Sequence, residues 1–240
     1  MEGQALPGRH DYHTHLLPGI DDGAESWENA LQMAAVLADC GFTHACCTPH
    51  QIYGLYAPDV GQVEFAVARL QQQVDDAGIP LTVMPGMEYL LDDNFAQHLD
   101  CLLPLGDSEQ VLVELPNHTS LEPLLELLFA IVRRGFVPLI AHPERCQRLF
   151  VDSRSFHFWF GKKKTECAPL VEQMVQMGCR FQANIGSFCG FYGPQARHQA
   201  RTMLNGGLYS CFGSDAHNPD DLKGYLRLGM SVLEHQGVEV

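Results

Sequence analysis

The chain has 240 residues and a formal net charge of −14, because 15 Lys and Arg side chains stand against 29 Asp and Glu side chains. Hydrophobic residues make up 46% and charged residues 18%, which is typical of a globular protein and not of a disordered one. The acidity argues against a nucleic-acid binder that neutralises phosphates, and the longest basic run is the three lysines at 162–164.

The nine cysteines are odd in number, and no two of them form a C-x-x-C pair. Several lie in apolar runs, where free cysteine acts as a small core residue, and this usage indicates a reducing compartment. Residues 1–9 lack the basic-then-apolar layout of a signal peptide, and no apolar stretch approaches the ~20 residues that span a bilayer. The sequence therefore predicts a cytoplasmic protein without a membrane segment.

Short apolar, β-prone runs alternate with stretches of helical spacing along the whole chain. Strands are predicted at residues 10–14, 43–48, 81–85, 111–115, 137–141, 180–185 and 208–212. Helices are predicted at 25–39, 60–77, 121–134, 166–177, 195–205 and 221–236. This alternation predicts parallel strands joined by helical crossovers, hence an α/β barrel or a doubly wound sheet.

No change of composition divides the chain, so residues 1–240 are predicted to form a single domain. The segment 151–165 breaks the periodicity, because an aromatic run at 156–160 is followed by a glycine and the three lysines. We predict an insertion or extended loop there. The aromatic and lysine residues at 156–164 could form a substrate-facing lid, a partner contact or a plain exposed loop.

Histidines and acids recur where the predicted strands end. His13 and His15 close the first strand and share a face, because strand side chains alternate. A lone histidine after a strand is usually a hydrogen-bonded loop residue, but the C-terminal strand ends of an α/β barrel converge on one mouth, and nine such side chains would meet there. They are His13, His15, an aspartate of the turn Asp21-Asp22-Gly23, His50, Glu88, Glu114, His142, Asp215 and His217. Their number indicates three metal ions, and imidazole with carboxylate suits Mn, Fe or Zn.

Taken in chain order, the stretches that contain these residues resemble those of the PHP (polymerase and histidinol phosphatase) superfamily. Within it, the sequence is similar to the bacterial manganese-dependent protein-tyrosine phosphatases of capsule and exopolysaccharide loci. The matching stretches are D-Y-H-T-H-L-L-P-G-I-D-D-G (11–23), T-P-H (48–50), M-P-G-M-E (84–88), V-E-L (113–115), A-H-P-E-R (141–145) and S-D-A-H-N (214–218). An H-x-H element alone also opens amidohydrolases, whereas the full ordered set is highly specific.

The resemblance implies a distorted (β/α)₇ barrel, TIM-like in architecture, with three divalent ions, most often manganese. One ion would be held by His13, His15, Glu88 and Asp215, a second by Asp22, His50 and His217, and a third by Glu114 and His142 with Glu88 bridging. Arg145 would bind the phosphate. Three divalent cations against four carboxylate ligands leave about +2 in the pocket, so the acidity of the whole chain does not exclude a phosphoryl substrate.

The implied activity is hydrolysis of phosphotyrosine in a protein, such as the tail of a bacterial tyrosine kinase that controls polysaccharide export. The metals would polarise the phosphoryl group and acidify the attacking water, while Asp215 or His217 could donate the proton to the leaving oxygen. A cysteine nucleophile is not needed, and no cysteine has an arginine six residues later, as the C-x₅-R loop of cysteine phosphatases requires.

Two features depart from the family pattern. Leu222 stands where relatives often carry arginine, so Asn218 and Lys223 could partly substitute, and the last helix is expected to be shortened because the chain ends at Val240. Two other functions stay open: a histidinol-phosphate phosphatase or another small-molecule phosphoesterase, and a metal-binding subunit without catalysis. DNA processing is disfavoured by the acidic balance.

Overall fold

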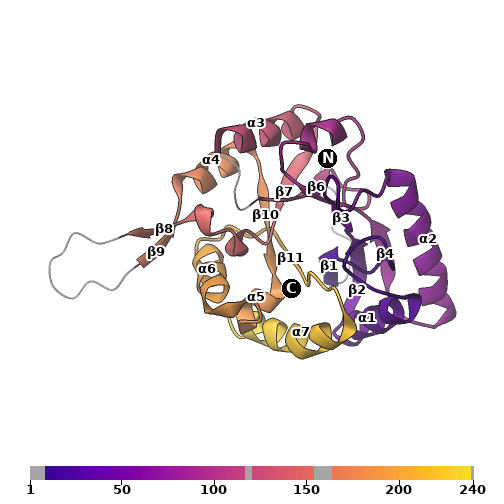
Figure 1. The fold of residues 1–240 in the computed structure, drawn as a ribbon. Coiled ribbons are helices and arrows are strands. Elements are labelled where there is room, and N and C mark those ends of the chain that lie inside the picture. Colours follow the sequence, from indigo (N-terminus) through magenta and orange to yellow (C-terminus); the bar gives the residue numbers. More distant parts are fainter. Residues whose placement is uncertain (1–8, 117–120, 154–163, 239–240) are drawn as a thin grey trace.

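The computed structural model describes residues 9–116, 121–153 and 164–238. Figure 1 shows a ring of strands surrounded by helices, with one hairpin projecting from the ring. The strands of the ring are β1 (Arg9–Thr14), β2 (Phe42–Cys47), β3 (His50–Gln51), β4 (Thr82–Pro85), β5 (Glu88–Leu90), β6 (Gln110–Glu114), β7 (Val137–Ala141), β10 (Arg180–Asn184) and β11 (Cys211–Gly213). The helices are α1 (Trp27–Asp39), α2 (Val60–Asp76), α3 (Leu121–Val132), α4 (Pro169–Met177), α5 (Ile185–Cys189), α6 (Gly193–Asn205) and α7 (Pro219–Glu234).

The strands of the ring form one curled parallel sheet. The strand orders β1-β2-β4 and β11-β10-β7-β6-β5-β3 are joined because β3 follows β2, and β5 follows β4, after interruptions of two residues. At the other edge, β11 meets β1, since the Asp215 N–H donates to the His13 carbonyl at 2.8 Å and the His15 N–H to the Ala216 carbonyl at 2.9 Å. The predicted barrel is confirmed, and the doubly wound alternative is wrong, because the first strand lies against the last.

Local sequence signals explain the helices that cover the sheet. Ser26 caps α1 by accepting from the Asn29 N–H, and Gly41, at φ 86°, follows the end of the helix. Asp59 and Gln62 form a reciprocal capping box at the start of α2. No helix among the residues described is both long and apolar enough to cross a membrane.

The predicted insertion is a hairpin. Strand β8 (Phe150–Ser153) pairs antiparallel with β9 (Lys164–Cys167), and Figure 1 shows the two strands projecting from the ring beside α4 and α6. The predicted helix at 166–177 begins later, at Pro169, because β9 takes its first residues. The aromatic and lysine segment at 156–163 lies outside the described residues.

The interior of the ring is packed in two layers. An apolar layer contains Cys46, Leu105, Leu112, Leu139, Ala141 and Cys211, with Tyr12 and Met84 packed against it. A polar layer begins at the next residue of β1, His13, which is fully buried. The pairing of β1 with β2 shifts register between Asp11 and Thr14. A bulge of this kind re-aims side chains, so Tyr12 and His13 can both reach the interior.

Candidate metal centre

The structure brings the nine predicted ligands together at one end of the ring, where most of them end or follow a strand, while His50 and Glu88 begin the short strands β3 and β5. They fall into four overlapping groups in which ligand-type atoms lie within 4.8 Å of one another. The groups are His15, Asp22, His50 and His217; His13, His15 and Glu88; His13, His142 and Asp215; and His50, Glu88 and Glu114. Overlapping groups of imidazole and carboxylate indicate more than one metal site.

The first pair of histidines has a defined proton arrangement. The Gln182 Oε1 atom accepts from the His142 N–H at 3.3 Å, so the nearby His13 Nδ1, at 3.0 Å, must be the donor. His15 Nδ1 donates in the same way to Asp21 Oδ2 at 2.7 Å. With each Nδ1 as the donor, the two Nε2 atoms face one another at 3.0 Å, and both are available to bind a metal ion.

Glu88 lies at the centre of the polar layer and is fully buried. Its carboxylate is 3.2 Å from His13 Nε2, 2.9 Å from His50 Nδ1 and 3.1 Å from His142 Nε2. Burial raises its pKa, but the charges and hydrogen bonds of these histidines hold it well below the ordinary value. Glu88 Oε2 and His50 Nδ1 lie 2.9 Å apart, but in a geometry that makes no hydrogen bond between them. Buried polar atoms without hydrogen bonds are costly, and a shared cation would satisfy both.

Two ligand positions carry backbone strain. Among the described residues, His142 (φ 28°) and Asp215 (φ 57°) are the two non-glycine residues with positive φ. Such conformations cost about 1–3 kcal/mol and gather at functional sites.

Gly23 lies where an added Cβ would be 2.3 Å from the His15 carbonyl oxygen, so the loop after β1 can pack against His15 only with glycine there.

The outer part of the site is partly open to solvent. The Asp22 side chain is 53% exposed, and its Oδ1 lies 3.6 Å from His50 Nε2 and 3.7 Å from His217 Nε2. Burial, together with the positive charge of His15, lowers the pKa of His217. Burial, followed by the charge of Glu88, raises the pKa of Glu114. Both pKa shifts arise because these ionisable side chains are buried close to one another.

Arg145 adjoins this cluster and keeps donors free for a ligand. Its Nη1 donates to Asp215 Oδ2 at 2.6 Å, and its guanidinium carbon lies 4.7 Å from the centre of the Tyr192 ring. The same Asp215 oxygen accepts from Asn184 Nδ2 at 2.9 Å and from the Tyr192 hydroxyl at 3.3 Å. The Arg145 side chain is 36% exposed, so its remaining N–H groups can reach an anion in the site.

Several supporting residues were not predicted from the sequence. Asp21 bonds both His15 and the His50 N–H, yet the doublet D-D-G alone does not show which aspartate supports and which binds. Glu144 is buried and accepts from the Asn184 N–H and the hydroxyls of Ser187 and Tyr209, which fixes the turn between His142 and Arg145. The sequence offered one sign of this role, because Glu144 stands between His142 and Arg145 in the motif A-H-P-E-R.

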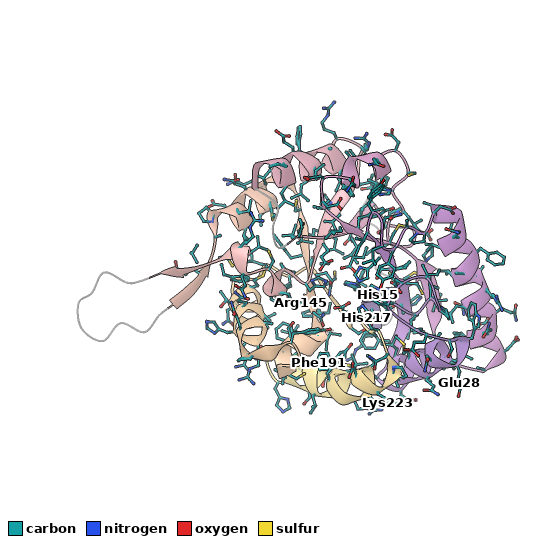
Figure 2. All side chains as sticks on the ribbon, in the orientation of Figure 1. His15, Glu28, Arg145, Phe191, His217 and Lys223 are labelled. Carbon is teal, nitrogen blue, oxygen red and sulfur yellow. The ribbon has the colours of Figure 1, made fainter. Side chains whose placement is uncertain are left out.

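The residues expected to replace a missing arginine do not reach the cluster. Leu222 is fully buried in the core, and Lys223 lies 3.9 Å from Asp220 and lines a groove between α1 and α7. Figure 2 shows Lys223 at the periphery and Arg145, His15 and His217 in the middle of the ring. Asn218 caps α7 by accepting from the Asp221 N–H. Its side-chain contacts are thus local to that helix.

The donor set fits divalent metal ions. The facing imidazole nitrogens, the buried Glu88 oxygen that makes no hydrogen bond and the strained backbone at His142 and Asp215 all fit cations held at the mouth of the ring. A curled parallel sheet with such a site at its carboxyl ends defines the class of TIM-barrel-like metal-dependent hydrolases.

Comparison with known proteins gives the family. The model of the family described as "Capsular polysaccharide synthesis, CpsB/CapC" matches residues 9–237. The tyrosine-protein phosphatase YwqE of Bacillus subtilis (strain 168) is 28% identical over 228 residues, which cover 94% of this chain and 84% of that protein. The tyrosine-protein phosphatase CpsB of Streptococcus pneumoniae is 24% identical over 230 residues, covering 93% and 88%.

A solved structure from work on YwqE of Bacillus subtilis and CpsB of Streptococcus pneumoniae, described as unique metal-dependent tyrosine phosphatases, superposes with a TM-score of 0.80 at 28% identity. It covers 95% of this chain and 87% of that one. The chain belongs to the CpsB/CapC family of capsular polysaccharide synthesis, and the predicted resemblance is confirmed.

Proposed function

We propose that this chain is a metal-dependent protein-tyrosine phosphatase linked to capsular or exopolysaccharide synthesis. Membership of the CpsB/CapC family supports the activity, because relatives over nearly the whole chain carry the name tyrosine-protein phosphatase. The observation that carries the proposal is the pair of facing His13 and His15 Nε2 atoms beside Glu88, with the partly exposed Arg145 next to the same cluster. This geometry combines cation binding with a donor for a phosphoryl oxygen.

The proposed ligand sets are those implied by the sequence motifs. His13, His15, Glu88 and Asp215 would hold one ion; Asp22, His50 and His217 a second; Glu114 and His142, with Glu88 shared, a third. Divalent cations at such sites polarise a phosphoryl group and make water more acidic. Asp21 and Gln182 keep the His15 and His13 protons on Nδ1, so that both Nε2 atoms stay available as ligands.

Arg145 is proposed to bind the phosphate. One of its N–H groups is engaged by Asp215, which fixes the guanidinium plane, and the Tyr192 ring supports it from one side. The free N–H groups can then donate to phosphoryl oxygens, whose negative charge the guanidinium offsets. Arg145 therefore orients the substrate and stabilises charge at the phosphorus.

Asp215 and His217 are proposed as ligands, and either could also donate a proton to the leaving oxygen. Burial raises the pKa of Asp215, but His13, His15 and Arg145 hold it well below the ordinary value. A phenol has a pKa of about 10, so a tyrosyl oxygen leaves as phenolate more readily than an alkoxide and depends less on a general acid.

The native metal, the protein substrate and the location of the chain in the cell are proposed as well. Manganese is the proposed native metal, with iron or zinc as alternatives, because the ligands are imidazole and carboxylate without thiolate. The proposed partner is the tyrosine-rich tail of a bacterial tyrosine kinase. All nine cysteines are free, which supports a reducing, cytoplasmic location.

The test is hydrolysis by the purified protein. We expect manganese-dependent release of phosphate from p-nitrophenyl phosphate and from a phosphotyrosyl peptide, loss of activity with a chelator, and less inhibition by vanadate than a cysteine phosphatase shows. Histidinol phosphate serves as the comparison substrate. Full activity of the His13→Ala, His15→Ala double variant would contradict the proposal, as would faster turnover of histidinol phosphate than of the peptide.

A further inference from the structure

Three large apolar side chains are exposed on segments that adjoin the metal centre. Tyr53 is 61% exposed, Leu55 is 66% exposed and Phe191 is 46% exposed. We call these three residues the aromatic rim. Single exposed apolar side chains are ordinary on a protein surface. These three are of interest because the segments that bear them contact residues of the metal centre.

Tyr53 and Leu55 belong to a tight turn that starts two residues after His50. The turn is closed by the Ile52 N–H donating to the Tyr56 carbonyl at 2.7 Å and the Tyr56 N–H donating to the Ile52 carbonyl at 3.0 Å. The Tyr56 ring lies 6.1 Å from the His50 ring at an interplanar angle of 16°. The turn is therefore closed by its own hydrogen bonds and lies against a residue of the metal centre, which reduces the cost of ordering its two apolar side chains for binding.

Phe191 is attached to the Arg145 side of the centre. Its ring lies 4.9 Å from the Tyr192 ring at 89° and 4.6 Å from the Tyr225 ring. Tyr192 in turn contacts both Arg145 and Asp215. Figure 2 shows Phe191 at the inner edge of the helix layer, below Arg145 and His217, whereas Glu28 and Lys223 lie further out. The rim thus has one part beside His50 and another beside Arg145.

We propose that the aromatic rim binds the ring of a phosphotyrosyl residue and the apolar side chains next to it in a peptide. This inference rests on the proposed function and adds the element that selects the substrate. A phosphate bound by the partly exposed Arg145 leaves the tyrosyl ring and its peptide to contact the segments beside His50 and Tyr192 that bear the rim residues. A phosphoseryl side chain has no ring to offer these apolar side chains, so the rim favours aryl phosphates in peptides.

The experiment uses the full chain loaded with manganese. Its variants are the double Tyr53→Ser, Leu55→Ser change and the single Phe191→Ser change. The matched controls are Leu228→Ser on α7, whose residue is 61% exposed, and Phe129→Ser on α3, whose residue is 52% exposed. Substrates are a phosphotyrosyl peptide with apolar neighbours, the same peptide with phosphoserine, and p-nitrophenyl phosphate. Affinity for the peptide carrying a non-hydrolysable phosphonate at the tyrosine is measured by fluorescence anisotropy.

Rim variants should raise KM for the phosphotyrosyl peptide, and Kd for the phosphonate peptide, by about tenfold, which corresponds to about 1.4 kcal/mol. Their kcat for p-nitrophenyl phosphate and both control variants should stay within about twofold of the parent, a difference of about 0.4 kcal/mol. Rim variants with unchanged Kd and KM would overturn the inference and leave the proposed function intact. A parent protein that cleaves p-nitrophenyl phosphate but not the phosphotyrosyl peptide would overturn the proposed function, and the phosphonate affinities then decide about the rim separately.

Discussion

Within the ring of strands, the apolar layer around Leu112 and Leu139 and the polar layer around His13 and Glu88 are built by neighbouring residues of the same elements. The apolar layer is stabilised by burial alone, which is worth about 1.5–3 kcal/mol for each large side chain. The polar layer has buried atoms without hydrogen-bond partners and two strained backbone positions. By itself that arrangement is destabilising, and metal binding offsets the cost because it adds its free energy to the folded state.

The residues that stabilise the fold and the residues that form the metal centre occupy different levels along the axis of the barrel. Strand β7 supplies Leu139 and Ala141 to the apolar layer, and His142, at the end of the same strand, belongs to the metal centre. Substitutions in the lower layer should therefore change stability, and those in the upper layer should change chemistry.

The largest effect is expected for Glu88→Gln. The amide keeps the size of the side chain but removes the charge that three histidines face. Turnover should fall by about 10³-fold or more, which equals about 4 kcal/mol in the barrier. The measurement is kcat together with bound metal per chain. Glu64→Gln on the exposed surface of α2 is the control, and a Glu88→Gln protein with full metal content and parental kcat would refute the role of this carboxylate.

Leu139→Ala should act on stability instead. Leu139 is fully buried in the apolar layer, and truncation of such a residue costs about 2–5 kcal/mol. The loss is read from urea unfolding with and without metal. Turnover per folded molecule at low temperature should stay within about threefold of the parent, a difference of about 0.7 kcal/mol. A collapse of kcat as large as that of Glu88→Gln would show that the two layers are not independent.

Asp21→Asn should have an intermediate effect, because Asp21 supports His15 and does not belong to the grouped ligands. Loss of such a support costs about 10–100-fold in metal affinity or activity. Although burial raises it, the hydrogen bond and charge of His15 lower the pKa of Asp21 to about 2.

A lowered pKa also predicts how the effect of Asp21 depends on pH. The carboxylate binds fewer protons in the folded than in the unfolded chain, so its contribution to stability is complete above the ordinary pKa of about 3.9. It is lost as the pH falls towards the folded value of about 2. The free-energy difference between parent and Asp21→Asn, measured by denaturation from pH 7 down to pH 3, should shrink only below pH ~4. A difference that shrinks already above pH 6 would contradict this assignment.

The smallest effect is expected at Tyr192, which supports Arg145 through its ring. Tyr192→Leu should raise KM by about fivefold to tenfold, because a cation over an aromatic ring is worth about 0.5–2 kcal/mol. Tyr192→Phe keeps the ring and should rescue KM to within about twofold, or about 0.4 kcal/mol. If both variants behave alike, the hydroxyl bond to Asp215 and not the ring is what positions Arg145.

The sequence by itself determined the class of fold and the set of candidate ligands. Hydrophobic periodicity and the spacing of turns are local properties, so seven strand positions and the helices between them could be predicted. Histidines and acids at strand ends could be grouped because parallel strands end at one edge. The motif D-x-H-x-H with H-P-E-R gave the family on the same basis, since each motif is contiguous in the chain.

Only the tertiary structure decided how the ring closes and how the ligands are held. The contact of β11 with β1 joins residues about 200 positions apart, and no local pattern distinguishes it from an open sheet. The same is true of Gln182 on His13, Asp21 on His15 and Tyr192 under Arg145. Side-chain hydrogen bonds and ring contacts depend on distances between strands and loops, and these exist only after the chain has packed.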